Sequence, residues 1–319
     1  MTGHERKTAD LPLAVWPCAQ RTSQWQRYGR YLPESNRHPG KMLPALARKA
    51  IETYSDPGGL VVDPMCGIGT TLVEAIGLGR RAIGVELEPR WSKLAAANIE
   101  HAHKDRRTRT LTAVVEGDAR KLARVLSLRA PGLLGDPGSQ ARRVGVGAAD
   151  LILMSPPYAC EVADVNPVSG PEPLRRADTT NYSRDRRNLG HARGSAYLTA
   201  MADIYEACAA VLKPGGFLVC VTKDMRSAGG GALRNLSGET IALCEEVGLL
   251  YWQRVISLLA TIRDSELVMR PSFWQMLHAR RRRAQDDRTH VVAHEDVLVF
   301  RKPQQAATKA RAVPTRKAA

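Results

Sequence analysis

The sequence predicts an α/β fold, in which a mostly parallel, seven-stranded sheet carries helices on both faces. Short apolar runs alternate along the chain with segments of helical periodicity, as in successive βα units. The apolar runs are nearly continuous, which is typical of strands buried on both faces. With 319 residues, 44% apolar and 25% charged, the chain is long enough for one large domain. Ligands of such sheets bind beyond the carboxyl ends of the strands, so site residues are expected there.

The elements follow one another in a regular order. A helix is predicted before the first strand, where six residues share one face at helical spacing: Leu43, Leu46, Ala47, Ala50, Ile51 and Tyr54. Strands are predicted at 59–64, 80–88, 111–119, 149–158, 217–224, 249–260 and 294–302. Helices are predicted at 70–79, 89–104, 195–212 and 236–248, a helix or turn at 121–130, and a loop at 131–149. The run Lys213–Gly216 is expected to be a turn.

Three parts of the chain are distinguished by composition. Residues 1–37 are expected to be an irregular segment, and 38–301 to form the main domain with polar insertions at 159–194 and 262–290. Residues 302–319 form a basic tail without acidic residues, which is predicted to be disordered.

The charge balance favours a polyanionic partner. The chain has 47 Lys and Arg against 32 Asp and Glu, a net charge of +15.

No apolar run is long enough to span a bilayer and the start is too polar for a secretory signal, so a cytoplasmic protein is expected. The six scattered cysteines read as reduced thiols, and no zinc or other metal site is expected.

A glycine-containing turn follows the first strand. It reads Asp63-Pro64-Met65-Cys66-Gly67-Ile68-Gly69-Thr70-Thr71. Glycines let a ligand approach the backbone, and the next helix begins with free N–H groups. The pattern matches neither the dinucleotide fingerprint nor the P-loop. A carboxylate at Asp63 disfavours a pyrophosphate and suits a cationic or amino ligand.

Two further acidic residues end the next strands. Glu86 lies 23 residues after Asp63 and is placed to accept both hydroxyls of a ribose. Asp118 ends the third strand, where it is placed to meet an adenine amino group. The structural alternatives are helix capping by Glu86, a role that suits Glu88 better, and an N-cap at Asp118.

The fourth strand ends in Ser155-Pro156-Pro157-Tyr158. Consecutive prolines fix the backbone and remove two N–H donors, which leaves carbonyl acceptors for a ligand NH₂ group. Tyr158 supplies a ring for stacking on a base, or alternatively belongs to a turn with a core tyrosine. Tyr197 and Tyr205, in the later helix, read as core residues.

These motifs resemble the S-adenosylmethionine-dependent amino-group DNA methyltransferases over about residues 38–300. The resemblance rests on DPMCGIGTT, the acidic end of the second strand and SPPY, and the segment HPGKMLPALARKAI is similar to the family's methionine-side cofactor segment. Met65 and Cys66 depart from the family's usual residues. The resemblance implies a Rossmann-like class I methyltransferase fold and S-adenosylmethionine as the cofactor.

The resemblance also implies residue roles. Asp63, Gly67 and Gly69 would line the methionine portion, with Thr70 and Thr71 nearby; Lys41, Pro64 and Cys66 complete the expected cofactor site. Glu86 would hold the ribose and Asp118 would touch the adenine. Ser155, Pro156, Pro157 and Tyr158 would form the catalytic corner, with Ser155 and the Pro156 carbonyl accepting from the target amine and Tyr158 stacking on the base.

The family's chemistry leaves alternatives for the substrate. Ser155 at the start of SPPY favours cytosine N4, and adenine N6 stays open. Cys160 is not expected to be a nucleophile, because two residues separate it from Pro157. An RNA methyltransferase acting on a guanine N2 is the main alternative, although only about 37 residues precede the core where that class usually carries an RNA-binding domain. A catalytically inactive nucleic-acid-binding fold is the third.

The two insertions are the expected nucleic-acid contacts, because they mix arginine with aromatic residues. The residues are Arg184, Arg186, Arg187, Trp274, Arg280, Arg281, Arg282 and Arg283. A solvated helix face is the alternative for Arg280–Arg283. The sequence leaves open whether the protein is a monomer or a homodimer, and whether a restriction nuclease accompanies it.

Overall fold

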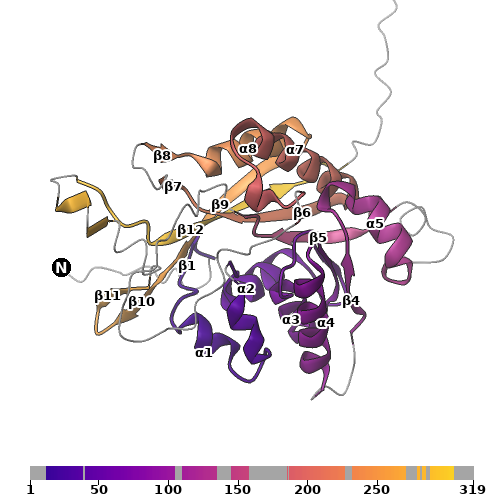
Figure 1. The fold of residues 1–319 in the computed structure, drawn as a ribbon, viewed down its shortest axis with the longest axis horizontal. Helices are drawn as coiled ribbons and strands as arrows, with labels where there is room; N and C mark the ends of the chain where they lie inside the picture. The colour runs from indigo at the N-terminus through magenta and orange to yellow at the C-terminus, as the bar shows by residue number, and fades with distance from the viewer. Residues whose placement is uncertain are drawn as a thin grey trace, which may run out of the picture.

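A computed structural model describes residues 12–38, 40–104, 110–134, 145–157, 185, 187–226, 232–270, 279–280, 282–284 and 288–304. Its central sheet has the strand order β1-β9-β12-β6-β5-β2-β3-β4 (Figure 1). The strands are β1 Val15–Trp16, β2 Leu60–Asp63, β3 Arg81–Glu86, β4 Thr112–Glu116, β5 Ala149–Met154, β6 Leu212–Thr222, β9 Leu250–Leu258 and β12 His294–Arg301. All neighbours are parallel except β12, which is antiparallel to both β6 and β9. The predicted α/β fold is confirmed, with eight strands instead of seven.

Helices cover both faces of this sheet. One face carries α2 Pro44–Tyr54, α3 Thr70–Gly77 and α4 Pro89–His103, and the other carries α5 Leu122–Arg129, α7 Gly194–Val211 and α8 Leu236–Glu246 (Figure 1). Along β2, the side chain of Val61 packs against the helices of the first face, and that of Val62 packs against the helices of the second face. Burial on both faces explains why the sequence of each central strand is apolar without alternation.

Residues 12–37 of the segment expected to be irregular pack into the fold, and residues 1–11 lie outside the described residues. Within it lie β1, which pairs with β9, α1 Ser23–Arg27 and the 3₁₀ turn η1 Pro33–Arg37. Tyr31 Oη donates to Glu74 Oε1 at 2.7 Å, and Arg30 forms a 2.6 Å ion pair with the same carboxylate on α3. A two-residue strand has too little periodicity to be recognised in the sequence, so β1 was not predicted.

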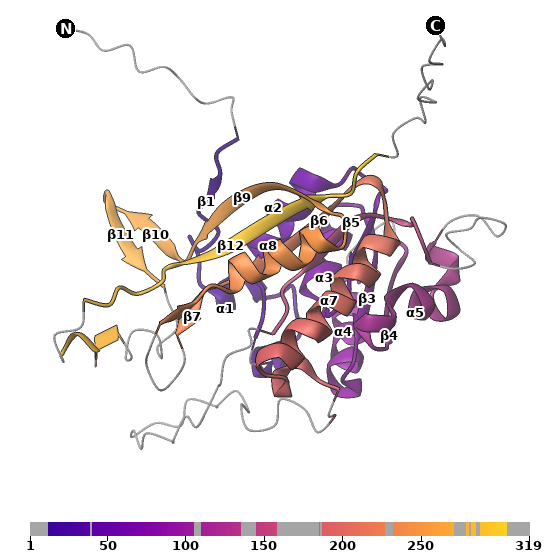
Figure 2. The ribbon, with the colours of Figure 1, turned by 90° about the horizontal axis from the view of Figure 1, so that it is seen from above.

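Other differences lie at turns and insertions. Lys213–Gly216 is part of β6 and not a separate turn, because Leu212 already pairs with Ala149 before the register shifts. The second insertion opens with an antiparallel hairpin of β10 Ala260–Arg263 and β11 Glu266–Met269, which stands away from the main sheet (Figure 2). The remaining short elements are η2 Ala119–Lys121, η3 Pro131–Leu133, η5 Leu189–His191, β7 Met225–Arg226 and β8 Leu233–Arg234.

Most of the first insertion and of the tail lies outside the described residues. Residues 185 and 187–194 are described from the insertion 159–194, and residues 302–304 from the tail. Within the ranges given above, no helix has both the length and the apolar character needed to cross a membrane.

Gly84→Ala is expected to destabilise the fold. A Cβ at this position of β3 would lie 2.6 Å from Cys66 Sγ and 2.8 Å from Leu72 Cδ1. Overpacking of this kind lowers the free energy of unfolding by about 1–3 kcal/mol. Urea unfolding measures the loss, and Gly132→Ala, with no atom within 4 Å of the added Cβ, serves as the control. Equal stability of the two variants would contradict the packing on β3 of residues 63–71, which we call the glycine loop.

Candidate active site

Parallel pairing brings the acidic strand ends to one edge of the sheet. Asp63 pairs with Gly84 across β2 and β3, and Glu86 pairs with Glu116 across β3 and β4. Asp118 follows two residues after Glu116. On the other side of β2, Val62 pairs with Ile152, so the chain leaves β5 toward Ser155 at the same edge. The expected cofactor and catalytic segments therefore face one region.

The glycine loop is folded against the end of β3. Cys66 N donates to Val85 O at 3.0 Å, and Gly69 N donates to Cys66 O at 2.8 Å. Gly67 and Gly69 have φ values of 53° and 82°, in the region that favours glycine, and Gly69 caps α3. The Cys66 side chain packs toward Gly84 in the core, and burial raises the pKa of its thiol well above the usual value. Cys66 therefore offers a ligand only its backbone.

Asp63 is a buried carboxylate with two internal donors. Its side chain accepts from Met65 N at 3.1 Å and from Thr71 Oγ1 at 2.6 Å. Burial raises the pKa of Asp63 to about 7, even though both hydrogen bonds favour the charged form. Proton binding to this carboxyl group is therefore expected near neutral pH.

Glu86 joins the glycine loop to the turn after β3. Oε2 accepts from Gly67 N and Oε1 accepts from Glu88 N, both at 2.8 Å. Burial raises the pKa of Glu86, and the amides of Glu88 and Gly67 partly offset this effect. In the described part of the chain, no lysine, arginine or histidine forms an ion pair with Asp63 or Glu86. The two carboxylates keep lone pairs for the hydroxyl or cationic groups of a ligand.

Asp118 is held differently from the other two acids. It caps η2 by accepting a hydrogen bond from Arg120 N at 3.0 Å. This is the N-cap that the sequence offered as the alternative to a role in adenine binding. The Arg120 guanidinium also binds both its oxygens, at 3.0 and 2.7 Å. Burial alone would raise the pKa of Asp118, but the hydrogen bonds from Arg120 lower it. A cleft of about 640 Å³ opens beside this pair and is also lined by Arg187 and Asp203.

The Pro-Pro corner is fixed by a tyrosine from another element. Pro156 is buried, while Ser155 and Pro157 are half-buried. Tyr197 Oη, on α7, donates to Pro157 O at 3.0 Å, and the Tyr197 side chain is buried. The sequence places Tyr197 in the core but gives no signal for this contact, because the two residues are 40 positions apart. Tyr158 lies outside the described residues.

The segment before α2 closes one side of the glycine loop. The His38 ring lies beside Gly67, where an added Cβ would come within 3.2 Å of Nε2, and Trp91 packs edge-on against it at 4.5 Å. Lys41 Nζ donates to the carbonyls of His38 and Asn36. Burial, with a smaller contribution from Arg27, lowers the pKa of Lys41 to about 8. His38 and Trp91 were not predicted as site residues.

The expected nucleic-acid contacts are only partly described. Arg187 pairs with Asp185 at 2.5 Å, and its carbonyl accepts from Arg120 Nη2 at 3.4 Å. Arg282 and Arg283 donate to Thr289 Oγ1 and O, at 3.2 and 3.4 Å. Arg280 is exposed. Arg184, Arg186, Trp274 and Arg281 lie outside the described residues, as does Cys160.

Comparison with known proteins confirms the resemblance to the amino-group DNA methyltransferases. Residues 3–97 match the DNA methylase family model for N6 and N4 methyltransferases. This range contains the glycine loop, Asp63, Glu86 and the segment around Lys41. The match implies S-adenosylmethionine as the methyl donor.

Individual relatives match over shorter stretches. A DNA adenine methyltransferase, YhdJ of Escherichia coli (strain K12), is 36% identical over 74 residues, 23% of this chain and 25% of the relative. A tRNA (guanine(10)-N2)-dimethyltransferase of Methanocaldococcus jannaschii is 39% identical over 64 residues, 20% and 18% of the two chains. The chain thus spans a quarter or less of the length of these relatives. TrmN from Thermus thermophilus is 15% identical, with a TM-score of 0.46 over 87% of this chain and 53% of that one.

The pH dependence of stability is expected to report on Asp63. Its pKa is about 7 when folded and 3.8 for an unperturbed side chain, so the folded protein binds the proton more tightly between these values. The contribution of Asp63 to folding stability therefore falls as the pH rises from about 4 to 7 and is constant above that. The difference in unfolding free energy between wild type and Asp63→Asn measures it. Asp264→Asn, at an exposed turn, controls for the loss of one carboxylate. A flat difference for Asp63→Asn would contradict the burial of this carboxylate.

Proposed function

We propose that the protein is a DNA methyltransferase that transfers a methyl group from S-adenosylmethionine to an exocyclic amine of a flipped base, with cytosine N4 as the first candidate and adenine N6 as the second. The observation that carries the proposal is the meeting of two buried carboxylates, Asp63 and Glu86, with a Pro-Pro corner at one edge of the sheet. Such an edge can bind the methyl donor, S-adenosylmethionine, and present hydrogen-bond acceptors to the amine of the target base.

The residues at this edge fit S-adenosylmethionine as the methyl donor. Gly67 and Gly69 leave no Cβ at the turn, and the carboxylates of Asp63 and Glu86 match the ammonium and ribose hydroxyl groups. We assign the methionine portion to Asp63 and the glycines, with Pro64, Thr70, Thr71, Lys41 and the Cys66 backbone around it. Glu86 then takes the ribose, and Asp118 lies toward the adenine. Bound S-adenosylmethionine would supply the methyl group on a sulfonium sulfur, which is already activated for transfer.

The corner after β5 acts on the target amine. Ser155 and the Pro156 carbonyl accept hydrogen bonds from the amine, favour a pyramidal nitrogen and stabilise the positive charge that develops there. The rest of the effect is alignment, because the amine must face the methyl group directly. Tyr197 holds Pro157 in place from α7. Tyr158 is assigned to stacking on the base, which must leave the helical stack to reach the corner.

An RNA substrate is the second candidate, since one relative acts on tRNA by its name. DNA is preferred because the matched family model and YhdJ are both DNA methylases. Ser155 at the first position of the motif supports cytosine N4 over adenine N6. Contacts to the nucleic acid are assigned to the arginines of the two insertions and to Trp274 in the second of them.

The substrate is tested by transfer of a tritiated methyl group to duplex DNA and to tRNA, followed by nucleoside analysis. We expect label in N4-methylcytosine from DNA. Label in N6-methyladenine would change the base but keep the enzyme class. Label only in RNA would contradict the DNA assignment, and donor binding without transfer to either would favour a catalytically inactive binding fold.

Tyr197→Phe is expected to lower turnover without weakening donor binding. The variant keeps the packed ring and loses one hydrogen bond to Pro157 O, which is about 0.5–1.5 kcal/mol or roughly a two- to tenfold rate loss. Tyr205→Phe is the matched control, because this tyrosine is buried on the same helix and its hydroxyl faces Thr240. If the two variants behave alike, the positioning role of Tyr197 is wrong.

A further inference from the structure

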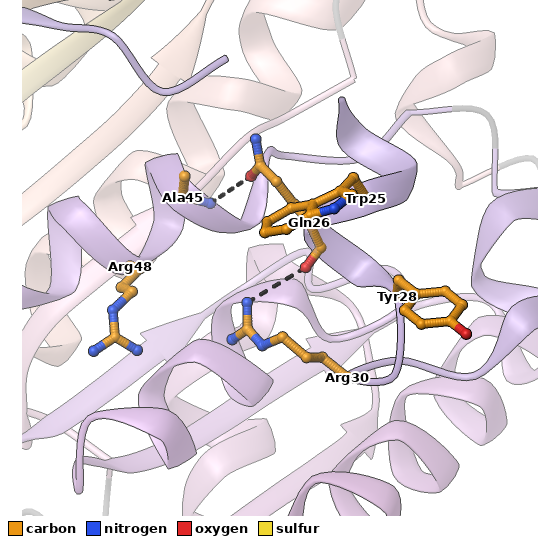
Figure 3. A pocket seen from close by; sticks show the side chains of 6 residues that line it. All are labelled: Trp25, Gln26, Tyr28, Arg30, Ala45 and Arg48. Atoms are coloured by element: carbon orange, nitrogen blue, oxygen red, sulfur yellow. Dashed lines mark hydrogen bonds between the residues drawn. The ribbon is translucent and has the colours of Figure 1, made fainter. Parts of the chain in front are cut away.

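Two aromatic side chains are exposed on the amino-terminal segment. Trp25 on α1 is 60% exposed, and Tyr28, directly after α1, is 87% exposed. They lie beside a hollow of about 340 Å³, with Arg30 and Arg48 on its other sides (Figure 3). Together with Arg21, we call these residues the α1 surface. Exposed aromatic rings among arginines are typical of surfaces that bind nucleic acid.

The α1 surface is held firmly on the domain. Gln26, between the exposed aromatics, is buried and donates through Nε2 to the carbonyls of Cys18 and Arg21, each at 2.9 Å. Its Oε1 accepts from Ala45 N at 2.9 Å in the first turn of α2 (Figure 3). Trp25 and Tyr28 are therefore presented by an anchored helix rather than by a loose end.

The surface presents positive charge. The Arg21 guanidinium lies 4.8 Å from the centre of the Trp25 ring. Arg30 pairs with Glu74, whose side chain is fully buried, so the guanidinium and not the carboxylate faces outward. Arg48 pairs with Glu52 on the exposed face of α2 at 3.1 Å. Among these residues, three guanidinium groups stand against two carboxylates, Glu52 and the buried Glu74, which leaves one positive charge in excess.

The segment that carries the α1 surface also contacts α3, the helix that begins at the glycine loop. Arg30 binds Glu74 on α3, four residues after the start of that helix. Tyr31 Oη is 3.4 Å from the carbonyl oxygen of Thr70, the first residue of α3. The α1 surface is therefore tied to the start of the helix that borders the candidate active site.

We propose that the α1 surface binds the sugar–phosphate backbone of the DNA that flanks the target base. The proposal rests on the proposed function. The guanidinium groups, the Trp25 indole N–H and the Tyr28 hydroxyl all donate to phosphate oxygens, and the ring faces pack on sugars. Contacts of this kind hold the duplex in position without reading its sequence, and none of these residues is among the insertion residues assigned to DNA above.

The test compares two exposed tryptophans that each pack against an arginine. Trp252 is 51% exposed and lies 5.1 Å from Arg301. It is near the start of β9, at the edge of the sheet opposite the one where the acidic strand ends meet. Binding of a fluorescent duplex is measured for Trp25→Ala, Tyr28→Ala and Trp252→Ala. We expect the first two to weaken binding about fivefold or more and Trp252→Ala to leave it unchanged. The affinity for S-adenosylmethionine should be the same in all three variants.

Salt dependence gives a second readout. Removing one phosphate contact lowers the slope of log K against log salt by about 1, so Arg21→Ala and Arg48→Ala should each flatten it. Unchanged duplex affinity in Trp25→Ala and Tyr28→Ala, with unchanged slopes in the arginine variants, overturns the proposal and points to a protein ligand or to plain solvent exposure.

Failure of the two proposals can be told apart. If the wild type neither binds nor methylates duplex DNA, the proposed function fails and the α1 surface loses its assigned ligand with it. If the wild type methylates the duplex and the α1 variants match Trp252→Ala in affinity and rate, only the α1 surface is refuted.

Discussion

The contact of Glu86 with the backbone of the glycine loop is the constraint on which the proposed site depends. One carboxylate oxygen accepts from Gly67 N and the other from Glu88 N, so this side chain fixes the loop over the end of β3. Asp63 fixes the other end of the loop through Met65 N and Thr71 Oγ1. Both carboxylates are buried, and neither forms an ion pair with a basic residue in the described part of the chain. Burial of such carboxylates is unfavourable by itself, and a ligand that supplies hydrogen-bond donors or positive charge would offset that cost.

The amino-terminal segment is part of this arrangement. Asn98 on α4 is fully buried, accepts from Leu32 N at 2.9 Å and donates to Ile68 O at 2.9 Å. One side chain thus links the segment after α1 to the glycine loop. With the Arg30–Glu74 ion pair, this link places the α1 surface and the candidate active site on one connected framework.

The sequence predicted most of the sheet, because runs such as Leu60–Val62 are short, apolar and bounded by turn residues. It also predicted which acidic residues meet at the carboxyl edge, since parallel pairing follows from the βα order. It missed features that depend on contacts between distant residues: the pairing of β1 with β9, the extension of β6 through Lys213–Gly216, and the hydrogen bond from Tyr197 to Pro157. The Arg120 partner of Asp118 was also missed, although it is only two residues away.

The most direct measurement is a crystal structure of the protein with bound S-adenosylmethionine. We expect the methionine portion to lie against residues 63–71, Glu86 to bind the ribose hydroxyls, and the methyl group to point toward Ser155 and Pro156. A donor bound elsewhere on the domain, or a Pro-Pro corner turned away from the methyl group, would contradict this expectation.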